Sequence, residues 1–434
     1  MEIINISSAR WQTQLKNSIV TASQLEQYLG NKLKVDINSI ANLFNTNIDS
    51  VENSVSQSPL EKVTEKYPMR ITPYYLSLIK NIGDPIWKQA VPDINELSNT
   101  SPEHFDLINS NDPLLKPFYP VNPYDPLHED SQSPVPSIIH RYPDRVIFLV
   151  SNQCAMYCRY CMRKRKVGLG DCTASGDYTD TESKLSSGNC VESKLSLGDR
   201  DYSEPKSNGL SNIDQGIDEG VHYIRNNKMI RDVILSGGDP LLLTTEKLDR
   251  ILFAIREIDH VETIRIHTRV LCTLPYRITE NLASILEKYH PLYINTHFNH
   301  PDEITDDAAS ACLTLIRAGI PLGCQTVLLK GVNDTPEIMV ELMRKLIKIR
   351  VKPYYLHHPD LIAGTYHFRP SFETGISIMK AMRGNLTGIA IPHYMIDLPG
   401  GYGKVPLLPN YMKHIDGSRA VVENYQGKTC QYWF

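Results

Sequence analysis

The sequence lacks the long apolar runs that membrane proteins carry. A membrane-spanning helix needs about 18 or more consecutive apolar residues, and no stretch of the 434 residues approaches that length. The amino terminus, MEIINISSARWQTQLKNSI, also lacks the basic and then apolar pattern of a secretory signal. We therefore expect a cytoplasmic protein that has no membrane partner.

The sequence also has little excess charge of either sign. It contains 45 Lys and Arg residues against 49 Asp and Glu residues, for a formal net charge of −4. Proteins that bind nucleic acid usually show a basic excess, so we expect no nucleic-acid partner. Hydrophobic residues make up an ordinary 41% of the chain, which is long enough for two or three folded units.

Cysteine is present in an odd number, which argues against a secreted disulfide framework. Such frameworks pair an even number of cysteines, whereas this chain has nine, and three of them lie close together. A reducing compartment suits this pattern, in agreement with a cytoplasmic location.

The three grouped cysteines, Cys154, Cys158 and Cys161, form a C-x3-C-x2-C motif. The apolar run RVIFLV at 145–150 precedes them and is typical of a buried strand, and four basic residues follow at 163–166. Three thiolates can hold three irons of a four-iron, four-sulfur cluster and leave the fourth iron open to a substrate or cofactor. The alternatives are chance spacing and structural zinc, which usually takes four protein ligands in paired knuckles.

From residue 145 onward, the sequence alternates between apolar runs and helical stretches such as 247–258 and 305–318. This alternation is typical of a parallel sheet with covering helices, and it predicts a partial barrel of six βα units. The six predicted strands are Val146–Val150, Val233–Leu235, Thr263–Ile266, Leu292–Asn295, Leu322–Leu329 and Pro353–Leu356.

Polar motifs follow most of these predicted strands. In a barrel of parallel strands, residues at the carboxyl ends of the strands meet at one rim and form the active site. We therefore expect a single site built from several motifs. These are the cysteine motif, Ser236-Gly-Gly-Asp239, His267-Thr-Arg269, His297-Phe-Asn-His300 and His357-His358.

The predicted core spans residues 121–360 and has a flanking region on each side. Residues 1–120 are expected to be mainly helical and to end in a proline-rich connector, and residues 361–434 form a C-terminal segment. Residues 169–214 interrupt the core with a polar stretch, in which ESKLSSG recurs as ESKLSLG. A stretch this polar buries too little apolar surface to become ordered, so we expect a disordered insertion. Its two cysteines, Cys172 and Cys190, are expected to have no role.

Five more residues have functional interpretations beside simpler ones. Lys404 ends the glycine-rich segment DLPGGYGK and could form a Schiff base with an aldehyde such as pyridoxal phosphate, or it could be an exposed loop lysine. Arg141 and Arg145 could hold a phosphate or form surface ion pairs. Asp360 and Asp397 each follow an apolar run. Together they would attract an ammonium group of a substrate, whereas either one alone is more often a cap or turn residue.

As a set, these motifs resemble those of the lysine 2,3-aminomutase family of radical S-adenosylmethionine enzymes. The resemblance covers nearly the whole chain outside residues 169–214. It implies an α/β fold, a partial (β/α)6 radical S-adenosylmethionine barrel with an N-terminal helical region and a C-terminal extension. The matching segments are CAMYCRYCMRKR, DVILSGGDPLLL, YINTHFNHPDEIT, LLKGVND, KIRVKPYYLHHPDL and DLPGGYGKVPLLPNY.

The resemblance implies an isomerase mechanism. One electron, from a flavodoxin- or ferredoxin-type donor, would cleave S-adenosylmethionine at the cluster to give a 5′-deoxyadenosyl radical. This radical would take a hydrogen from C3 of an amino acid held as an external aldimine on pyridoxal phosphate. The nitrogen would then move from C2 to C3. A homo-oligomer is also expected.

The resemblance further implies roles for individual residues. Lys404 corresponds to the Schiff-base lysine, and Arg163 to the partner of the substrate carboxylate. Arg141 and Arg145 fall where the family holds the phosphate of the cofactor. The residues that are expected to contact S-adenosylmethionine are Gly237, Gly238, Asp239, His297 and Gln325.

The resemblance also bears on the substrate. Lysine-acting members have two aspartates where Asp360 and Asp397 stand, whereas a glutamate-acting relative would carry a lysine and an asparagine. Because two buried carboxylates need a cation, we expect L-lysine, with β-lysine as the product; arginine and glutamate are the alternatives. The sequence departs from the lysine enzymes at Thr335, where a zinc-binding cysteine can stand, and at His357, where a tyrosine is usual. We therefore expect no zinc.

Two other functions remain open on the sequence alone. A radical S-adenosylmethionine enzyme could use the same core to modify a macromolecule, although the Lys404 loop would then have no role. A non-catalytic iron–sulfur or zinc scaffold could use the polar insertion to tether a partner. Such a scaffold would not cleave S-adenosylmethionine.

Overall fold

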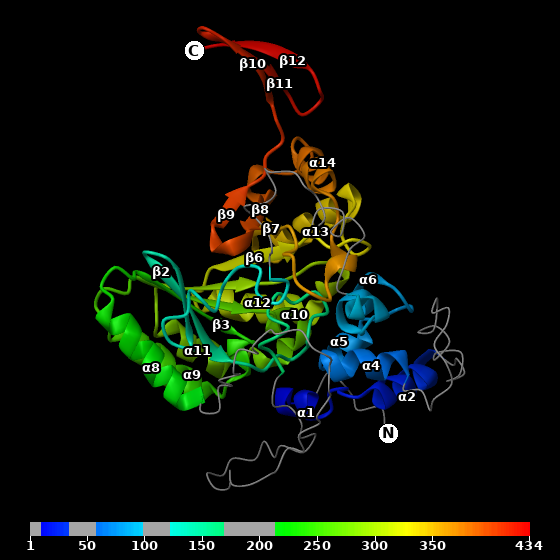
Figure 1. Cartoon of the computed structure of the whole chain (residues 1–434), viewed down its shortest axis with the longest axis vertical. Helices are drawn as coiled ribbons and strands as arrows, with labels where there is room; N and C mark the ends of the chain where they lie inside the picture. Colours follow the sequence, from blue (N-terminus) through cyan, green and yellow to red (C-terminus); the bar gives the residue numbers. More distant parts are fainter. Residues whose placement is uncertain (1–9, 34–57, 99–121, 169–212) are drawn as a thin grey trace, which may run out of the picture.

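The computed structural model describes residues 10–33, 58–98, 122–168 and 213–434 (Figure 1). The predicted insertion at 169–214 lies almost wholly outside the described residues, as do Cys172, Cys190 and most of the proline-rich connector. Within the described ranges, no helix is long and apolar enough to cross a bilayer.

A nine-stranded sheet forms the centre of the molecule, with its strands in sequence order. Strands β2 to β8 run parallel, and β1 and β9 pair antiparallel at the two edges. The strands are β1 Ile138–Tyr142, β2 Arg145–Ser151, β3 Asp232–Gly237, β4 Thr263–Thr268, β5 Leu292–Thr296, β6 Leu322–Val327, β7 Lys352–His357, β8 His393–Leu398 and β9 Gly403–Pro406.

The predicted fold class, an α/β partial barrel, is confirmed, and the six predicted strands correspond to β2 to β7. The sheet also continues past residue 360, because β8 is a seventh parallel strand and β9 turns back along it. The Lys404 backbone N–H donates a hydrogen bond of 2.9 Å to the Tyr142 hydroxyl, which connects edge strand β9 to edge strand β1. This contact places Lys404 at the junction of the two edges.

Helices between the strands cover one face of the sheet, and the main hydrophobic core lies between them and the sheet. Along β4, Ile264 and Ile266 are buried in this core, whereas Arg265 and His267 alternate with them and point to the barrel interior. Hydroxyl side chains cap the first turns of five of these helices; they belong to Thr244, Thr279, Thr305, Thr335 and Ser371. The helices are α8 Ile213–Asn226, α9 Thr245–Arg256, α10 Val270–Thr273, α11 Glu280–Glu287, α12 Asp306–Arg317, α13 Pro336–Lys348 and α14 Phe372–Met382. Short 3-10 helices are η2 Ile94–Leu97, η4 Pro240–Leu242, η5 Pro275–Arg277, η6 Pro301–Glu303, η7 Tyr366–Phe368, η8 Gly388–Ala390 and η9 Pro399–Gly401.

The described N-terminal helices form a second, smaller core beside the barrel. They are α1 Trp11–Lys16, α2 Ala22–Leu33, α4 Pro59–Lys66, α5 Pro73–Ser77 and α6 Pro85–Ala90. Met156, which lies between two of the grouped cysteines, is buried in this second core. The N-terminal helices are therefore packed directly on the cysteine loop.

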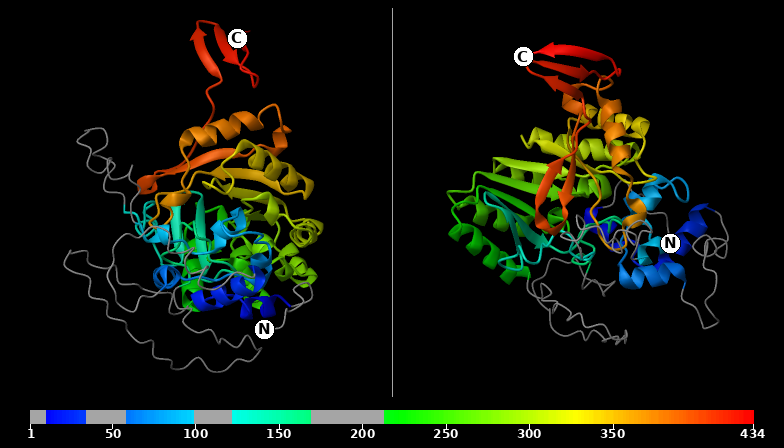
Figure 2. Two further views of the ribbon diagram at one scale, coloured as in Figure 1. Left: turned by 90° about the vertical axis from the view of Figure 1, so that its right-hand side faces the viewer. Right: turned by 45° about the horizontal axis from the view of Figure 1, so that its top comes forward.

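The C-terminal residues form a separate antiparallel sheet of three strands, β10 Met412–Asp416, β11 Arg419–Glu423 and β12 Thr429–Trp433. This sheet projects away from the barrel, to which a single extended stretch connects it (Figures 1 and 2).

Candidate active site

The three grouped cysteines follow β2 and lie at the carboxyl-end rim of the barrel. All three are free thiols and partly accessible. The Arg163 backbone N–H donates to Cys161 Sγ at 3.3 Å, and Arg269 Nη1 donates to Cys158 Sγ at 3.0 Å. Burial raises the pKa of Cys161 to about 11 and that of Cys154 well above its ordinary value. Three thiolates here therefore need a positively charged group to stabilise them.

The three thiols follow one another within eight residues of a single loop, and each cysteine of an iron–sulfur cluster binds a different iron. The donor set, three thiols and basic N–H donors, suits an anionic cluster.

Residues from the N-terminal region hold the cysteine loop in place. Arg70 Nη1 donates to Gln153 Oε1 at 2.9 Å, and the Arg70 carbonyl accepts from the Tyr157 N–H at 3.0 Å. The Arg159 N–H donates to the Gln89 carbonyl at 3.0 Å. The loop thus obtains part of its conformation from residues more than sixty positions away in the sequence.

A buried ion cluster strengthens this attachment. Glu96 accepts from Arg159 Nη2 and from Lys164 Nζ, both at 2.6 Å, and its side chain is fully buried. Burial acts to raise the pKa of Glu96, but Arg159 and Lys164 outweigh it and hold the pKa below its ordinary value. Burial lowers the pKa of Lys164 to about 8. Two of the basic residues in the cysteine segment are therefore structural.

The Ser236-Gly-Gly-Asp239 motif lies directly against the cysteine loop. The Gly238 N–H donates to the Ser151 carbonyl at 2.6 Å, and the Asp239 N–H donates to the Gln153 carbonyl at 2.7 Å. Gly237 has a φ of +112°, and a Cβ there would come within 2.2 Å of the Ser151 carbonyl oxygen. Only glycine allows this approach of the two backbones. The motif thus shapes the loop, whatever ligand its backbone also meets.

The Asp239 carboxylate is used inside the protein. It accepts hydrogen bonds from the Thr268 hydroxyl at 2.7 Å and from the Arg269 N–H at 2.7 Å. Burial raises the pKa of Asp239 above its ordinary value. This carboxylate therefore fixes the end of β4 and the backbone of Arg269.

Three histidines of the interior, of which His357 is buried and His267 and His297 are partly buried, are electrostatically linked to one another and to Lys404 or Arg163. Burial, with Arg269 next, lowers the pKa of His297 to about 4. Burial also lowers the pKa of His267 well below its ordinary value, and Arg265, His297, Arg163 and Lys404 lower it further. The His357 ring is 2.6 Å from Gln325 Nε2, and its pKa is likewise lowered, by burial and then by Lys404. Neutral imidazoles thus line the interior and connect the two predicted cofactor sites.

Lys404 lies in a cluster of charged side chains where β8 and β9 meet. Its Nζ donates to Asp397 Oδ2, and Arg141 Nη1 lies 3.5 Å from Asp397 Oδ1. His357 Nδ1 is 3.8 Å from Asp397 Oδ2. Burial raises the pKa of Asp360 to about 7; Asp397 adds to this rise and Lys404 opposes it. The structure therefore brings Lys404, Arg141, Asp360 and Asp397 together.

Arg145 is placed differently from Arg141. It begins β2, at the strand end opposite to the cysteines, and its side chain is 43% exposed and pairs with Asp144 at 2.8 Å. Its guanidinium also lies 5.1 Å from the centre of the Tyr142 ring, and the Tyr142 hydroxyl in turn accepts from the Lys404 N–H. Arg145 is thus connected to Lys404 only through Tyr142.

Arg163 is nearly buried and keeps a donor free. Its Nη2 donates to Glu129 Oε1 at 3.0 Å, and its Nη1 donates to the Ser236 hydroxyl at 3.3 Å. Its Nε is buried without a hydrogen-bond partner. Burial acts to raise the pKa of Glu129, but Arg163 and Lys166 outweigh it and keep the pKa low. A spare buried donor suits an incoming carboxylate.

Several residues of the site had no sequence motif of their own. Gln89, Glu96 and Arg70 belong to the N-terminal region, where short helices and loops carry no pattern that marks such contacts. Arg269 does stand in a polar motif after β4, which was the available signal. Its contact with Cys158 depends on tertiary packing.

Comparison with known proteins finds that this chain is similar to aminomutases over most of its length. A family model described as lysine-2,3-aminomutase matches residues 379–433. The L-lysine 2,3-aminomutase of Methanococcus maripaludis is 43% identical over 93% of this chain and 80% of its own length. The L-lysine 2,3-aminomutase of Clostridium subterminale is 40% identical over 89% of this chain and 81% of its own. The glutamate 2,3-aminomutase of Clostridioides difficile is 38% identical, with 89% of this chain and 79% of its own length covered.

Among solved structures, a radical SAM methyltransferase from Sphaerobacter thermophilus is similar in part. It matches 42% of this chain and 57% of its own, with 17% identity and a TM-score of 0.34. That likeness is too partial to bear on activity. The sequence relatives cover most of both chains, however, and this chain belongs to the lysine 2,3-aminomutase family.

Proposed function

We propose that the protein is an isomerase that moves the 2-amino group of L-lysine to C3 and so forms β-lysine. The observation that carries this proposal is the cluster at Lys404, where Asp397 pairs with the Lys404 ammonium beside Arg141 and, after burial, raises the pKa of its neighbour Asp360. Two neighbouring carboxylates attract a cationic group. The side-chain ammonium of lysine would supply it.

Lys404 suits the role of the cofactor lysine. Its side chain is 30% exposed, so its amine can be reached, and its backbone is fixed by pairing with β8 and by Tyr142. Pyridoxal phosphate bound here would hold the migrating amino group covalently through its aldehyde carbon. Arg141, beside Asp397, and Arg145, beyond Tyr142, are the proposed phosphate partners.

The proposed cluster site uses Cys154, Cys158 and Cys161 as ligands. A cluster and S-adenosylmethionine bound there would supply the carbon radical that takes a hydrogen from C3. The protein residues proposed to line the S-adenosylmethionine site are Gly237, Gly238, Asp239, His297 and Gln325. His297 and the nearby histidines are neutral, so they add no charge repulsion toward a sulfonium.

Arg163 is the proposed partner of the substrate carboxylate. Its Nε is a buried donor without an acceptor, and Glu129 and Ser236 already hold its other two nitrogens in position. A lysine substrate would then be held at both ends, with its carboxylate at Arg163 and its far ammonium at Asp360 and Asp397. This arrangement favours lysine over glutamate, whose side chain would add a third carboxylate to the pair.

The proposed partners are a low-potential electron donor of flavodoxin or ferredoxin type and a second copy of this chain. Register places Met412, Ile415 and Tyr432 on one face of the C-terminal sheet, where they are 51%, 55% and 65% exposed. A small sheet with an uncovered apolar face is marginal by itself. Tyr402 and Leu408, which are also exposed, offer a matching apolar surface on a second copy.

The decisive experiment is an anaerobic conversion assay on reconstituted protein. Pyridoxal phosphate, S-adenosylmethionine and a reductant are added, and lysine, arginine, glutamate and alanine are supplied in parallel. We expect β-lysine from lysine alone, identified by chiral chromatography with mass detection. The Lys404→Ala variant should retain its cluster and lose this turnover together with the absorption of bound pyridoxal phosphate.

Each other outcome would contradict part of the proposal. Conversion of glutamate or alanine but not lysine would show that the two aspartates do not select a cation. Full turnover by Lys404→Ala would exclude the pyridoxal mechanism and favour a radical enzyme that modifies a macromolecule.

A further inference from the structure

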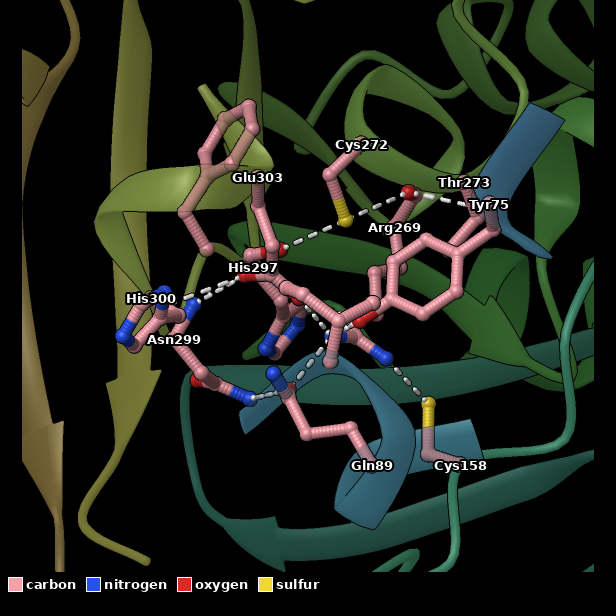
Figure 3. A network of polar contacts seen from close by, with 12 residues as sticks. Tyr75, Gln89, Cys158, Arg269, Cys272, Thr273, His297, Asn299, His300 and Glu303 are labelled. Carbon is pink, nitrogen blue, oxygen red and sulfur yellow. Dashed lines mark hydrogen bonds and ion pairs between the residues drawn. The ribbon is translucent and has the colours of Figure 1, made fainter. Parts of the chain in front are cut away.

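Arg269 contacts a cysteine of the proposed cluster site from outside the cysteine loop. It follows β4, and its Nη1 donates to Cys158 Sγ at 3.0 Å (Figure 3). Its Nε is buried and has no hydrogen-bond partner among the residues that the structure describes. The guanidinium therefore directs one donor to a ligand sulfur and has another to spare.

Three further contacts fix this guanidinium, and a fourth fixes the backbone of Arg269. Its Nη2 donates to Glu303 Oε1 at 2.5 Å, to Gln89 Oε1 at 2.7 Å and to the Tyr75 hydroxyl at 3.3 Å. The Arg269 N–H is held by Asp239 Oδ2. Figure 3 shows Tyr75, Gln89 and Glu303 around Arg269, which faces Cys158 on one side and Glu303 on the other.

Glu303 is itself held in a fixed position. Its side chain is fully buried, and it accepts from the Tyr75 hydroxyl at 2.6 Å and from the Asn299 N–H at 2.5 Å. A buried ion pair of this kind adds little to stability compared with an apolar replacement. Its fixed geometry instead orients the N–H toward sulfur.

We propose that Arg269 raises the reduction potential of the cluster by donating an N–H···S hydrogen bond to Cys158. The inference rests on the proposed cluster site. One-electron reduction adds negative charge to a buried anionic cluster, and a fixed donor at a ligand sulfur stabilises that charge. Arg269 acts as a positioning residue through Cys158 and has no part in hydrogen transfer. Glu303, which pairs with the same guanidinium, limits the effect.

The test is an electron paramagnetic resonance titration with titanium(III) citrate as the reductant. Iron and sulfide contents are measured on each reconstituted protein. For Arg269→Gln, which removes the charge, we expect the equilibrium constant for one-electron reduction to fall at least tenfold, a shift of about 59 mV to lower potential. Glu303→Gln removes the opposing carboxylate and should shift the potential in the other direction.

The control is Arg277→Gln. Arg277 is also a buried guanidinium, but it donates to the carbonyls of Leu241 and Leu243. Its removal should leave the potential unchanged, so a general effect of losing a buried charge can be recognised.

The outcomes separate this inference from the proposed function. Opposite shifts in Arg269→Gln and Glu303→Gln support the inference, because general destabilisation cannot produce opposite signs. No shift, or shifts in one direction, in proteins with full iron content would overturn it and leave the cluster site intact. Wild-type protein that takes up no iron and sulfide would instead contradict the proposed function. If Arg269→Gln does not fold, an unchanged potential in Glu303→Gln overturns the inference by itself.

Discussion

The cysteine loop and the Lys404 strand differ in how their buried charges are balanced. Beside the loop, two buried carboxylates have basic partners: Glu96 pairs with Arg159 and Lys164, and Glu129 pairs with Arg163. A third, Asp239, is held instead by the Thr268 hydroxyl and the Arg269 backbone N–H. Around Lys404, Asp397 pairs with both Lys404 and Arg141, and burial and then Asp397 raise the pKa of the neighbouring Asp360. Glu96 and Glu129 thus have their counter-ions within the protein. Under the proposed function, Asp360 and Asp397 would take a further cation from the substrate.

The largest effect should follow from removing the buried negative charge of Glu96 beside the cysteine loop. Glu96→Gln leaves Arg159 and Lys164 buried with no carboxylate, and breaking a buried pair in this way costs about 3–5 kcal/mol. We expect the free energy of unfolding in urea to fall by that amount.

The matched control is Asp130→Asn, because Asp130 also pairs with basic residues of the cysteine segment but is 52% exposed. Exposed pairs contribute roughly 0–1 kcal/mol, so little change is expected. Equal losses in the two variants would show that burial does not distinguish these pairs.

A smaller effect concerns the pH dependence of lysine binding at Asp360 and Asp397. Burial, and then Asp397, raise the pKa of Asp360 to about 7, and a cationic substrate needs this carboxyl ionised. Lysine affinity should therefore increase about tenfold between pH 6 and pH 8, as measured by calorimetry on the protein with bound cofactors. Norleucine, which lacks the far ammonium, should bind without this dependence.

The same pKa shift has the opposite sign for stability. Between the ordinary Asp pKa of 3.8 and about 7, the folded protein keeps a proton that the unfolded chain has lost. This contribution to stability is therefore present at low pH and is lost as the pH rises through 7. Asp360→Asn should flatten both profiles; a variant that keeps the pH dependence of lysine binding would assign it to another group.

The smallest effect is expected at the C-terminal sheet, far from the cysteine loop and from Lys404. Tyr432→Ser removes apolar surface from the exposed face and should weaken self-association at least tenfold in sedimentation velocity, with little effect on folding. Gln431→Ser, on the opposite face of the same strand, is the control. Association that is equally sensitive to both changes, or to neither, would place the interface elsewhere.

Much of the site was predictable because it depends on local order in the chain. Polar motifs after successive parallel strands must meet at one rim, and Asp360, which follows β7, and Asp397, which lies near the end of β8, come together there. Lys404 reaches them differently, from β9, which runs back antiparallel to β8. The contact between Arg269 and Cys158 was not predictable in this way. It depends on how α5, α6 and η6 pack around β4, and no periodicity in the sequence encodes those distances.

The sequence also indicated only part of the extent of the barrel. The run before Asp397 reads as a strand, but its place beside β7 depends on pairing between Leu356 and Tyr394. The chain after residue 360 therefore continues the same sheet and carries Lys404 back to Tyr142.

The sequence by itself determined the family, the cysteine motif and the alternation of strands and helices, because each depends only on residue type and spacing. Tertiary structure decided how charge is distributed among those residues. It paired Glu96 with Arg159 and Lys164, placed Arg269 beside Cys158, and grouped Asp397 with Lys404 and Arg141 next to Asp360. Charge balance depends on distance and burial, and both arise only when segments far apart in the chain pack together.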